Sequence, residues 1–416
     1  MGLFGADTRP ITVIDLGSHQ VRVLVANLFD DGEIEMLGFG QRKSMGMSEG
    51  LILNPRQVEQ SLSDAVASAD NLAGTNTTRA YVGVNHKLVR SLTVRLEQNL
   101  NSQAVTPAMC QALQSTALEQ ANARLPKDMQ WANLHVIPLG YCIDGSEPTD
   151  FPDGIYGNKL QAEFHIVATP LMVIQNLKEC LSRTGIEVER FVLSPYAAAL
   201  GTLSPAHHEY GGTLVDLGGD ITSLAIFKGW KLRQTAVLPI GANDITRDVA
   251  QHFGFNPERA EKLKVTHGNL AATLSAPNFE AAANLFSAKE IEHIELNPIV
   301  EARMREILMA VREILNRPSL SRDLSQSLIF TGGGAQLKGL TAYAEALFHD
   351  KKVQVSLARA VSGMPEAVHH TGFATVMGLL HYAGKISSQK RRRAGFFRYT
   401  GVDSQALPVV RRLFGK

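Results

Sequence analysis

The chain has 416 residues, of which 44% are hydrophobic and 19% are charged, a composition ordinary for a globular protein. This length is too great for one hydrophobic core, so we expect two to four domains. The formal net charge of +1 gives no overall indication of nucleic-acid binding, and no apolar run approaches the roughly 18 residues that cross a bilayer. Three widely spaced cysteines, without metal-site spacing, favour a reducing, cytosolic compartment.

The N-terminal region carries a strand pattern rather than a targeting signal. Residues 1–10 lack the basic and apolar regions of a secretion signal, and Ala6 stands where a myristoylation site needs serine or threonine. Residues 11–25, ITVIDLGSHQVRVLV, predict a strand, an Asp-Leu-Gly turn and a second strand, and a turn at 30–32 leads to a third at 34–40. A single turn of this kind is most often only a hairpin.

The same plan recurs half a chain later. Residues 213–227, TLVDLGGDITSLAIF, again read as a strand, an Asp-Leu-Gly turn and a strand. The two copies match one for one, Asp15 with Asp216 and Gly17 with Gly218. The repeat predicts two like domains facing a cleft, in which glycine turns present backbone N–H groups to phosphate. The aspartates would hold Mg²⁺ through water, because this ion gives up its hydration shell reluctantly.

Three later segments add candidate features. Glu261 and Lys264, three residues apart on a predicted helix, would bracket a ribose, although a surface ion pair is the more common explanation of such spacing.

Residues 290–315 form the longest helical pattern, with a predicted buried stripe of Ile307, Leu308, Val311, Ile314 and Leu315. The segment LIFTGGGAQLKGL from Leu328 predicts a strand, three glycines and a helix start. Glycines let a flat ring lie against the backbone, but alone they fit a ligand-free loop equally well.

The C-terminal end differs in charge from the rest of the chain. Residues 390–416 carry a net charge of +7, whereas the remainder carries −6. Residues 384–393 predict the start of a flexible polar linker, and residues 404–416 predict a short amphipathic helix with Pro408 in its first turn. Such a helix is too short to persist in water and would order on an anionic membrane, the alternatives being a disordered tail or docking on the body. Its apolar face would contain Val409, Val410, Leu413 and Phe414, with Arg411 and Arg412 pointing away.

These motifs together resemble the actin, Hsp70 and sugar-kinase superfamily, and within it the FtsA family of bacterial cell-division proteins. The narrower resemblance is carried by HVIPLGYCIDG, FPDGIYGNKLQAEFHIVAT, PIGANDITRDVAQHFG and TGFATVMGLLHYA, which begin at positions 135, 151, 239 and 371. It implies an α/β, actin-like fold made of two duplicated, ribonuclease-H-like halves. The implied subdomains are 1A (10–83 and 166–205), SHS2-like 1C (84–165), 2A (206–240 and 323–384) and 2B (241–322), then a basic linker (385–403) and a membrane-targeting helix (404–416).

The resemblance also implies a function. Members bind ATP and Mg²⁺, polymerise, anchor the FtsZ ring to the cytoplasmic face of the inner membrane at the division site, and help recruit later division proteins. Glu301-Ala302-Arg303 falls where the family has Glu-Pro-Arg, so Arg303 and Arg305 are candidates to pair with acidic residues of the FtsZ tail, although a solvated helix face explains Arg305 equally well. Mg²⁺ is assigned to Asp15 and Asp216. Nucleotide binding is assigned to Asp15, Gly17, Ser18, His19, Asp216, Gly218, Gly219, Thr222, Gly241, Glu261, Lys264, Gly332, Gly333 and Gly334.

Departures from the family pattern bear on activity. In the second phosphate loop Asp220 replaces a glycine and Ile221 a threonine, and the carboxylate would oppose a nearby phosphate. In the first loop Gln20 stands where a lysine is common, which leaves His19 as its only potential cation. Ser194-Pro195 stands where relatives have Glu-Pro, so we expect little or no ATP hydrolysis. The alternatives are a pilus-assembly actin-like protein and, less favoured, a small-molecule kinase, for which no suitably placed acid is recognisable.

Overall fold

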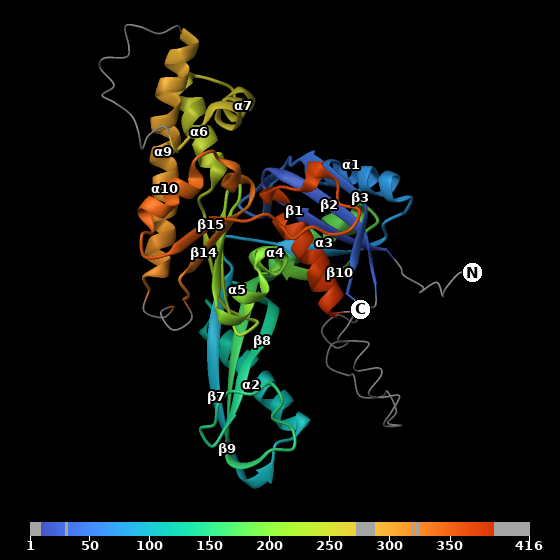
Figure 1. The fold of residues 1–416 in the computed structure, drawn as a ribbon. Helices are drawn as coiled ribbons and strands as arrows, with labels where there is room; N and C mark the ends of the chain where they lie inside the picture. Colours follow the sequence, from blue (N-terminus) through green and yellow to red (C-terminus); the bar gives the residue numbers. More distant parts are fainter. Residues whose placement is uncertain (1–9, 30–31, 272–287, 318–319, 321–323, 387–416) are drawn as a thin grey trace, which may run out of the picture.

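The structure is a computed structural model that describes residues 10–29, 32–271, 288–317, 320 and 324–386. Two five-stranded sheets organise these residues, and two smaller units extend from them in opposite directions (Figure 1). The predicted linker beyond residue 386 and the predicted amphipathic helix at 404–416 lie outside the described residues. No helix in the described part of the chain combines the length and apolar character needed to cross a membrane.

The first sheet has the strand order β10-β6-β1-β2-β3. Its hairpins, β1 (Ile11–Leu16) with β2 (Gln20–Leu28) and β2 with β3 (Ile34–Lys43), are antiparallel, whereas β6 (Arg79–Val84) runs parallel to both β1 and β10 (Glu187–Leu193). Helices α1 (Pro55–Ala73) and α3 (Leu171–Arg183) pack on one face through alanine, leucine and valine side chains. Helix α1 begins where Asn54 caps the Gln57 N–H and ends where Gly74 adopts a left-handed conformation.

The second sheet repeats this plan with the order β13-β12-β11-β14-β15. Strands β11 (Gly212–Leu217), β12 (Thr222–Lys228) and β13 (Lys231–Leu238) form antiparallel hairpins, and β14 (Ser327–Thr331) runs parallel to β11 and to β15 (Lys352–Val355). The internal duplication predicted from the Asp-Leu-Gly turns is therefore confirmed, strand for strand.

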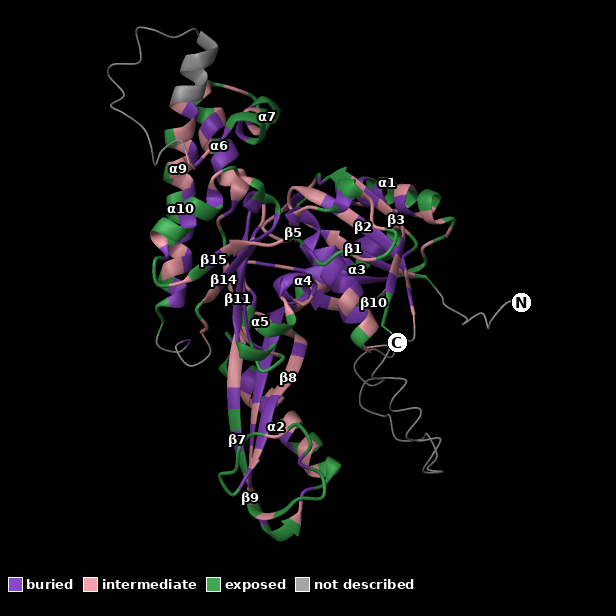
Figure 2. Ribbon diagram, viewed as in Figure 1, coloured by how far each residue is buried: buried purple, intermediate pink, exposed green. Residues whose placement is uncertain are grey.

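The two extending units are insertions, one in each half. Between β6 and α3, strands β7 (Arg90–Ala104), β8 (Trp131–Ile143) and β9 (Tyr156–Pro170) form an antiparallel sheet in the order β7-β9-β8, with α2 (Pro107–Arg124) packed on it. Between β13 and β14 lie α6 (Ala242–Phe253), α7 (Pro257–His267) and α9 (Ala288–Leu315). Buried and exposed residues alternate along α9 (Figure 2), and the predicted stripe is confirmed as buried: Ile307, Leu308, Val311, Ile314 and Leu315.

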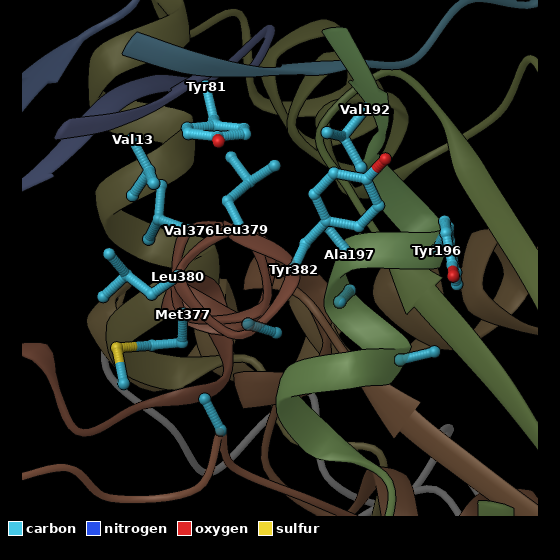
Figure 3. Close-up of a cluster of buried hydrophobic side chains, with 14 of the residues drawn as sticks. Val13, Tyr81, Val192, Tyr196, Ala197, Val376, Met377, Leu379, Leu380 and Tyr382 are labelled. Carbon is cyan, nitrogen blue, oxygen red and sulfur yellow. The ribbon is translucent and has the colours of Figure 1, made fainter. Parts of the chain in front are cut away.

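A shared core joins the two halves. Helix α4 (Ser194–Thr202) and the helical residues 374–386 lie between the sheets, and their side chains pack with strand residues of both halves, such as Val13 of β1 and Phe227 of β12. Figure 3 shows Val376, Leu379 and Leu380 beside Val13 and Tyr81. The helix continues through residue 386, so the first two residues of the predicted basic linker (385–403) are helical. The shorter elements are β4 (Met47–Ser48), β5 (Leu51–Ile52), α5 (Pro205–Tyr210), η2 (Gly333–Gln336), α10 (Leu340–Leu347), η3 (Glu366–Val368) and η4 (Thr371–Phe373).

Candidate functional site

A cavity of about 380 Å³ lies between the halves, where the β1–β2 turn, the β11–β12 turn and the loop after β14 meet. Most of the residues predicted to bind nucleotide line it: Asp15, Gly17, Ser18, His19, Asp216, Gly218, Gly219, Glu261, Lys264, Gly332, Gly333 and Gly334. Two do not line it. Thr222 is fully buried in β12, and Gly241 precedes α6 with its backbone packed on the β11–β12 turn.

The two glycine turns have the same local structure. In the first, the Gly17 N–H donates to the Gln20 carbonyl at 3.2 Å, and in the second the Gly218 N–H donates to the Ile221 carbonyl at 3.0 Å. A Cβ on Gly17 would lie 2.9 Å from the Gln20 oxygen, and one on Gly218 2.5 Å from the Ile221 oxygen. Both turns therefore need glycine in order to fold back this closely.

The two strand-end aspartates are half-buried and line the cavity. Burial, partly offset by the charge of Arg22, raises the pKa of Asp15 to about 6. Burial and the charge of Asp15 together raise the pKa of Asp216 to about 7, again against Arg22. No cluster of three or more metal-ligating side chains occurs in the described parts of the chain. The protein thus offers two carboxylates, which suits Mg²⁺, an ion that keeps several waters and takes phosphate oxygens as further ligands.

The triple-glycine loop combines a constrained residue with an open one. Gly332 has a φ of 88°, and a Cβ there would lie 2.2 Å from the Asp216 Oδ1 atom. Gly333 has no heavy atom within 4 Å of an added Cβ, so its bare backbone faces open space in the cavity. Val265 and Leu337 line the cavity near this loop and supply apolar surface. The loop thus presents open backbone to the cavity, which has apolar as well as polar side chains in its lining.

Glu261 and Lys264 form a fixed pair in the cavity wall. The Lys264 ammonium lies 2.7 Å from Glu261 Oε2, is only 7% exposed, and also donates to the Ala242 carbonyl at 3.0 Å and to Thr246 Oγ1 at 2.8 Å. Burial lowers the pKa of Lys264, although Glu261 opposes this shift. The pair is therefore not the surface ion pair that the spacing alone would suggest. His19 Nε2 lies 3.8 Å from Glu261 Oε1, which brings the first turn close to α7.

Asp220, the main departure in the second turn, is held by its neighbours as a hydrogen-bonded carboxylate. Its carboxylate accepts hydrogen bonds from the Asn243 Nδ2 atom at 2.9 Å, the Glu49 N–H at 3.1 Å and the Ser48 hydroxyl at 3.1 Å. Arg247 lies 3.6 Å away. Burial alone would raise the pKa of Asp220, but these hydrogen bonds and the Arg247 charge lower it. The charge expected to repel a phosphate is thus partly offset within the protein.

The structure adds residues that were not predicted to bind nucleotide. Arg22, Asn85, Ser194, Asn243 and His370 also line the cavity. The first turn itself has no cation except His19, as expected, but β2 brings a guanidinium to the same cavity two residues after Gln20. The alternation of a strand was the available signal, because residues two apart point to the same face.

The predicted partner site on α9 lies away from the cavity, and one of its two arginines is already paired within the protein. Arg303 makes two hydrogen bonds to Asp248, Nε to Oδ2 at 2.7 Å and Nη2 to Oδ1 at 2.9 Å, and a third to Glu306 at 2.6 Å. Arg305, by contrast, is exposed. The residues predicted to contact the membrane, from Val409 to Phe414, lie outside the described residues.

Comparison with known proteins identifies relatives of nearly the whole chain. A family model described as "Cell division protein FtsA" matches residues 213–378, and one described as "SHS2 domain inserted in FTSA" matches residues 87–168. The cell division protein FtsA of Pseudomonas aeruginosa is 29% identical over 406 residues, which cover 97% of this chain and 96% of that protein.

Solved structures support the fold. The PilM–PilN type IV pilus biogenesis complex has a TM-score of 0.67 at 16% identity, covering 90% of this chain and 98% of the other. MreB5 of Spiroplasma citri bound to AMPPNP has a TM-score of 0.51 at 14% identity, covering 93% and 99%. The predicted two-domain, actin-like α/β fold is therefore confirmed. At these identities the likeness concerns the fold alone.

Proposed function

This chain belongs to the FtsA family of cell-division proteins, and we propose that it binds ATP between its two halves and uses the bound nucleotide to control its assembly at the division site. The observation that carries the proposal is the pair of equivalent glycine turns, each preceded by a half-buried aspartate, that line one cavity between the halves. The AMPPNP bound to MreB5, which shares the fold, is consistent with this assignment.

Each part of the nucleotide has a candidate contact. The N–H groups of the two turns are available for phosphate, and Asp15 and Asp216 are the groups that would hold Mg²⁺ through its waters. When bound, the ion supplies positive charge to offset the phosphates. Glu261 offers carboxylate oxygens to the ribose hydroxyls, and the open backbone of Gly333 offers a flat surface to the base.

The acids of the site favour binding over hydrolysis. Of the four acids that line the cavity in the described part of the chain, Asp220 and Glu261 are engaged by hydrogen bonds and ion pairs with their neighbours, and Asp15 and Asp216 are the candidate metal ligands. Ser194 stands at the start of α4, and a hydroxyl is a poor general base. We therefore expect slow or absent turnover, with nucleotide acting as a switch.

The wider role that we propose is that of the family. The chain would form filaments, bind the C-terminal tail of FtsZ through α9, attach to the anionic inner face of the membrane through residues 404–416, and help recruit later division proteins. On α9 the exposed Arg305 is the more available cation, because Arg303 is already paired with Asp248. The pilus-assembly alternative rests on fold similarity to PilM alone, and the basic C-terminal end argues against it.

The test is whether Mg·ATP raises the melting temperature of the full chain. A ligand that binds only the folded state stabilises it by mass action. The wild type should show a shift that grows with ATP concentration, and Asp15→Ala should lose it. No shift in the wild type at millimolar ATP would mean that the protein is a scaffold with an actin-like fold but no nucleotide switch.

A further inference from the structure

Strand β2 presents a basic residue to the nucleotide cavity. Along this strand Val21 and Val23 are fully buried in the core under α1 and α3, whereas Gln20 and Arg22 are half-buried and line the cavity. In the hairpin, Arg22 stands opposite Asp15, the first strand-end aspartate. The alternation of the strand thus carries the cation into the phosphate region of the site.

The side chain of Arg22 is half-buried and has no hydrogen-bonding partner among the described residues. Its Nε atom has no acceptor, and the Arg22 side chain makes no hydrogen bond or ion pair within 4.0 Å with any residue in the described ranges. Its neighbours are the Phe373 ring, whose centroid lies 5.2 Å from Cζ, and Gly372, where an added Cβ would lie 2.8 Å from Nη2. The charges of Asp15 and Asp216 act on this guanidinium, but no acceptor among the described residues satisfies its N–H groups, so they are available to the oxygens of an anion.

The neighbouring Gln20 cannot supply this charge. Its side-chain carbonyl accepts a hydrogen bond from the Gln41 amide, and both of these side chains are neutral. A guanidinium presents several N–H donors in a planar fork that matches phosphate oxygens. With two carboxylates beside it, Arg22 changes the formal charge of the base of the cavity from −2 to −1, and Mg²⁺ would change it further to +1.

We propose that Arg22 is the phosphate-binding cation of this site, taking the place of the lysine absent at position 20, and that it binds the polyphosphate of a nucleoside triphosphate even without a metal ion. This inference rests on the proposed ATP binding and specifies which protein group pairs with the negative charge of the phosphates. It predicts a binding mode in which the loss of Mg²⁺ weakens ATP affinity but does not abolish it. It also predicts that Arg22 matters most when Mg²⁺ is absent, because a triphosphate would then meet two uncompensated carboxylates.

The experiment is calorimetric titration of the full chain with ATP at pH 8, in excess Mg²⁺ and in EDTA. Arg22→Ala should weaken ATP binding about tenfold or more in Mg²⁺, the range expected for charge-assisted hydrogen bonds, and further in EDTA. Adding Gln20→Lys to Arg22→Ala should restore much of the affinity, because it returns a cation to the same strand face. Arg95→Ala, which removes an exposed cation paired with Glu163 on the β7–β9–β8 sheet, is the matched control and should change nothing.

The outcomes separate the inference from the function it rests on. If the wild type binds no ATP in either buffer, the proposed function fails. If the wild type binds ATP and Arg22→Ala binds it as well as Arg95→Ala does, only the Arg22 assignment is overturned. The apo melting temperature of Arg22→Ala should fall modestly, since Asp15 and Asp216 lose the neighbouring charge that offsets theirs, so ATP affinity and not apo stability decides the assignment. A lower melting temperature in both Arg22→Ala and Arg22→Gln, with ATP affinity unchanged, would assign Arg22 to the fold instead.

Discussion

The carboxylate of Asp220 accepts a hydrogen bond of 3.1 Å from the backbone N–H of Glu49, across the cleft that divides the molecule. Glu49 lies in the β4–β5 hairpin of the first half, and Asp220 lies in the β11–β12 turn of the second. A second contact of this kind joins Asn85 Nδ2 to Ser223 Oγ at 2.6 Å. Asp220, which stands where the family has glycine, therefore links the two halves through hydrogen bonds to Ser48 and Glu49, here called the Asp220 latch. The sequence alone predicted only that its charge would repel a phosphate.

The first prediction concerns this latch. Asp220→Gly should lower the stability of the apo protein by about 1–3 kcal/mol, because the Asn243, Ser48 and Glu49 donors lose their acceptor. The same change should strengthen ATP binding, since a negative charge leaves the phosphate region. Denaturation and calorimetry measure the two effects, with the exposed Asp128→Ala as a control that changes neither. Unaltered apo stability would show that the latch contributes nothing.

The second prediction uses the contrast within the triple-glycine loop. Gly333→Val should leave the apo melting temperature nearly unchanged, because no heavy atom of the described residues lies within 4 Å of the position of its Cβ. It should nevertheless remove the ATP-dependent shift, because the added side chain would fill the space proposed for the base. Gly332→Ala should destabilise the apo protein, because its Cβ would lie 2.2 Å from Asp216 and its φ is positive. An intact ATP shift in Gly333→Val would move the base away from this loop.

Much of the fold follows from local sequence, but the charges of the site do not. The Asp-Leu-Gly repeats predict both hairpins because strand alternation and glycine turns are local properties. The hydrogen bonds of Asp220 could not be predicted from local sequence, because its partners Ser48 and Glu49 lie in the other half of the chain. The pairing of Arg303 with Asp248 could not be predicted either, because it depends on how α6 packs against α9.

The third prediction concerns pH. Burial lowers the pKa of four histidines, to about 3 for His135 and His165 and to about 4 for His208 and His381. In the unfolded chain these groups take up protons near pH 6.5, so below that pH the unfolded state binds more protons and stability falls. The stabilisation is present in full above pH 6.5 and is lost as the pH falls toward 4. The raised pKa values of Asp15 and Asp216 act in the opposite direction.

A single variant isolates the histidine contribution. His135 Nε2 accepts the Leu193 N–H at 3.0 Å, directly before α4, and glutamine can keep an acceptor there without titrating. Between pH 6.5 and 5, unfolding of His135→Gln should depend on pH less steeply than that of the wild type, by up to about 1.4 kcal/mol per pH unit. The exposed His349→Gln should keep the wild-type slope. Equal slopes in all three proteins would contradict a neutral, buried His135.

The fourth prediction separates the two arginines of α9. Arg305→Glu should weaken binding of a peptide copying the FtsZ C-terminal tail without changing the melting temperature, because Arg305 is exposed. Arg303→Glu should weaken peptide binding and also lower the melting temperature, because a carboxylate would face Asp248 and Glu306. Liposome binding should be unchanged in both. Wild-type peptide affinity in both variants would place the partner site off α9.

The last prediction concerns the C-terminal segment. With a net charge of −6, residues 1–389 should be weakly repelled by an anionic bilayer, so attachment depends on the +7 of residues 390–416 together with apolar burial. The apolar side chains of residues 409–414 would contribute on the order of 5 kcal/mol if mostly buried. The basic residues add an electrostatic attraction to the anionic lipids, which salt screens beyond a Debye length of ~8 Å. Neither contribution alone gives durable attachment, and polymerisation would multiply both through many linked segments.

The two contributions are distinguished by their salt dependence in liposome sedimentation. Phe414→Glu should release the protein even at low salt, because it removes apolar burial and adds a charge that the membrane repels. Arg411→Ala with Arg412→Ala should leave partial binding that added salt weakens little, because most of the screened attraction near the membrane is gone. Deletion of residues 404–416 should abolish binding. If the truncated protein still sedimented with anionic liposomes, the membrane contact would have to lie on the folded body, where the net negative charge makes it hardest to explain.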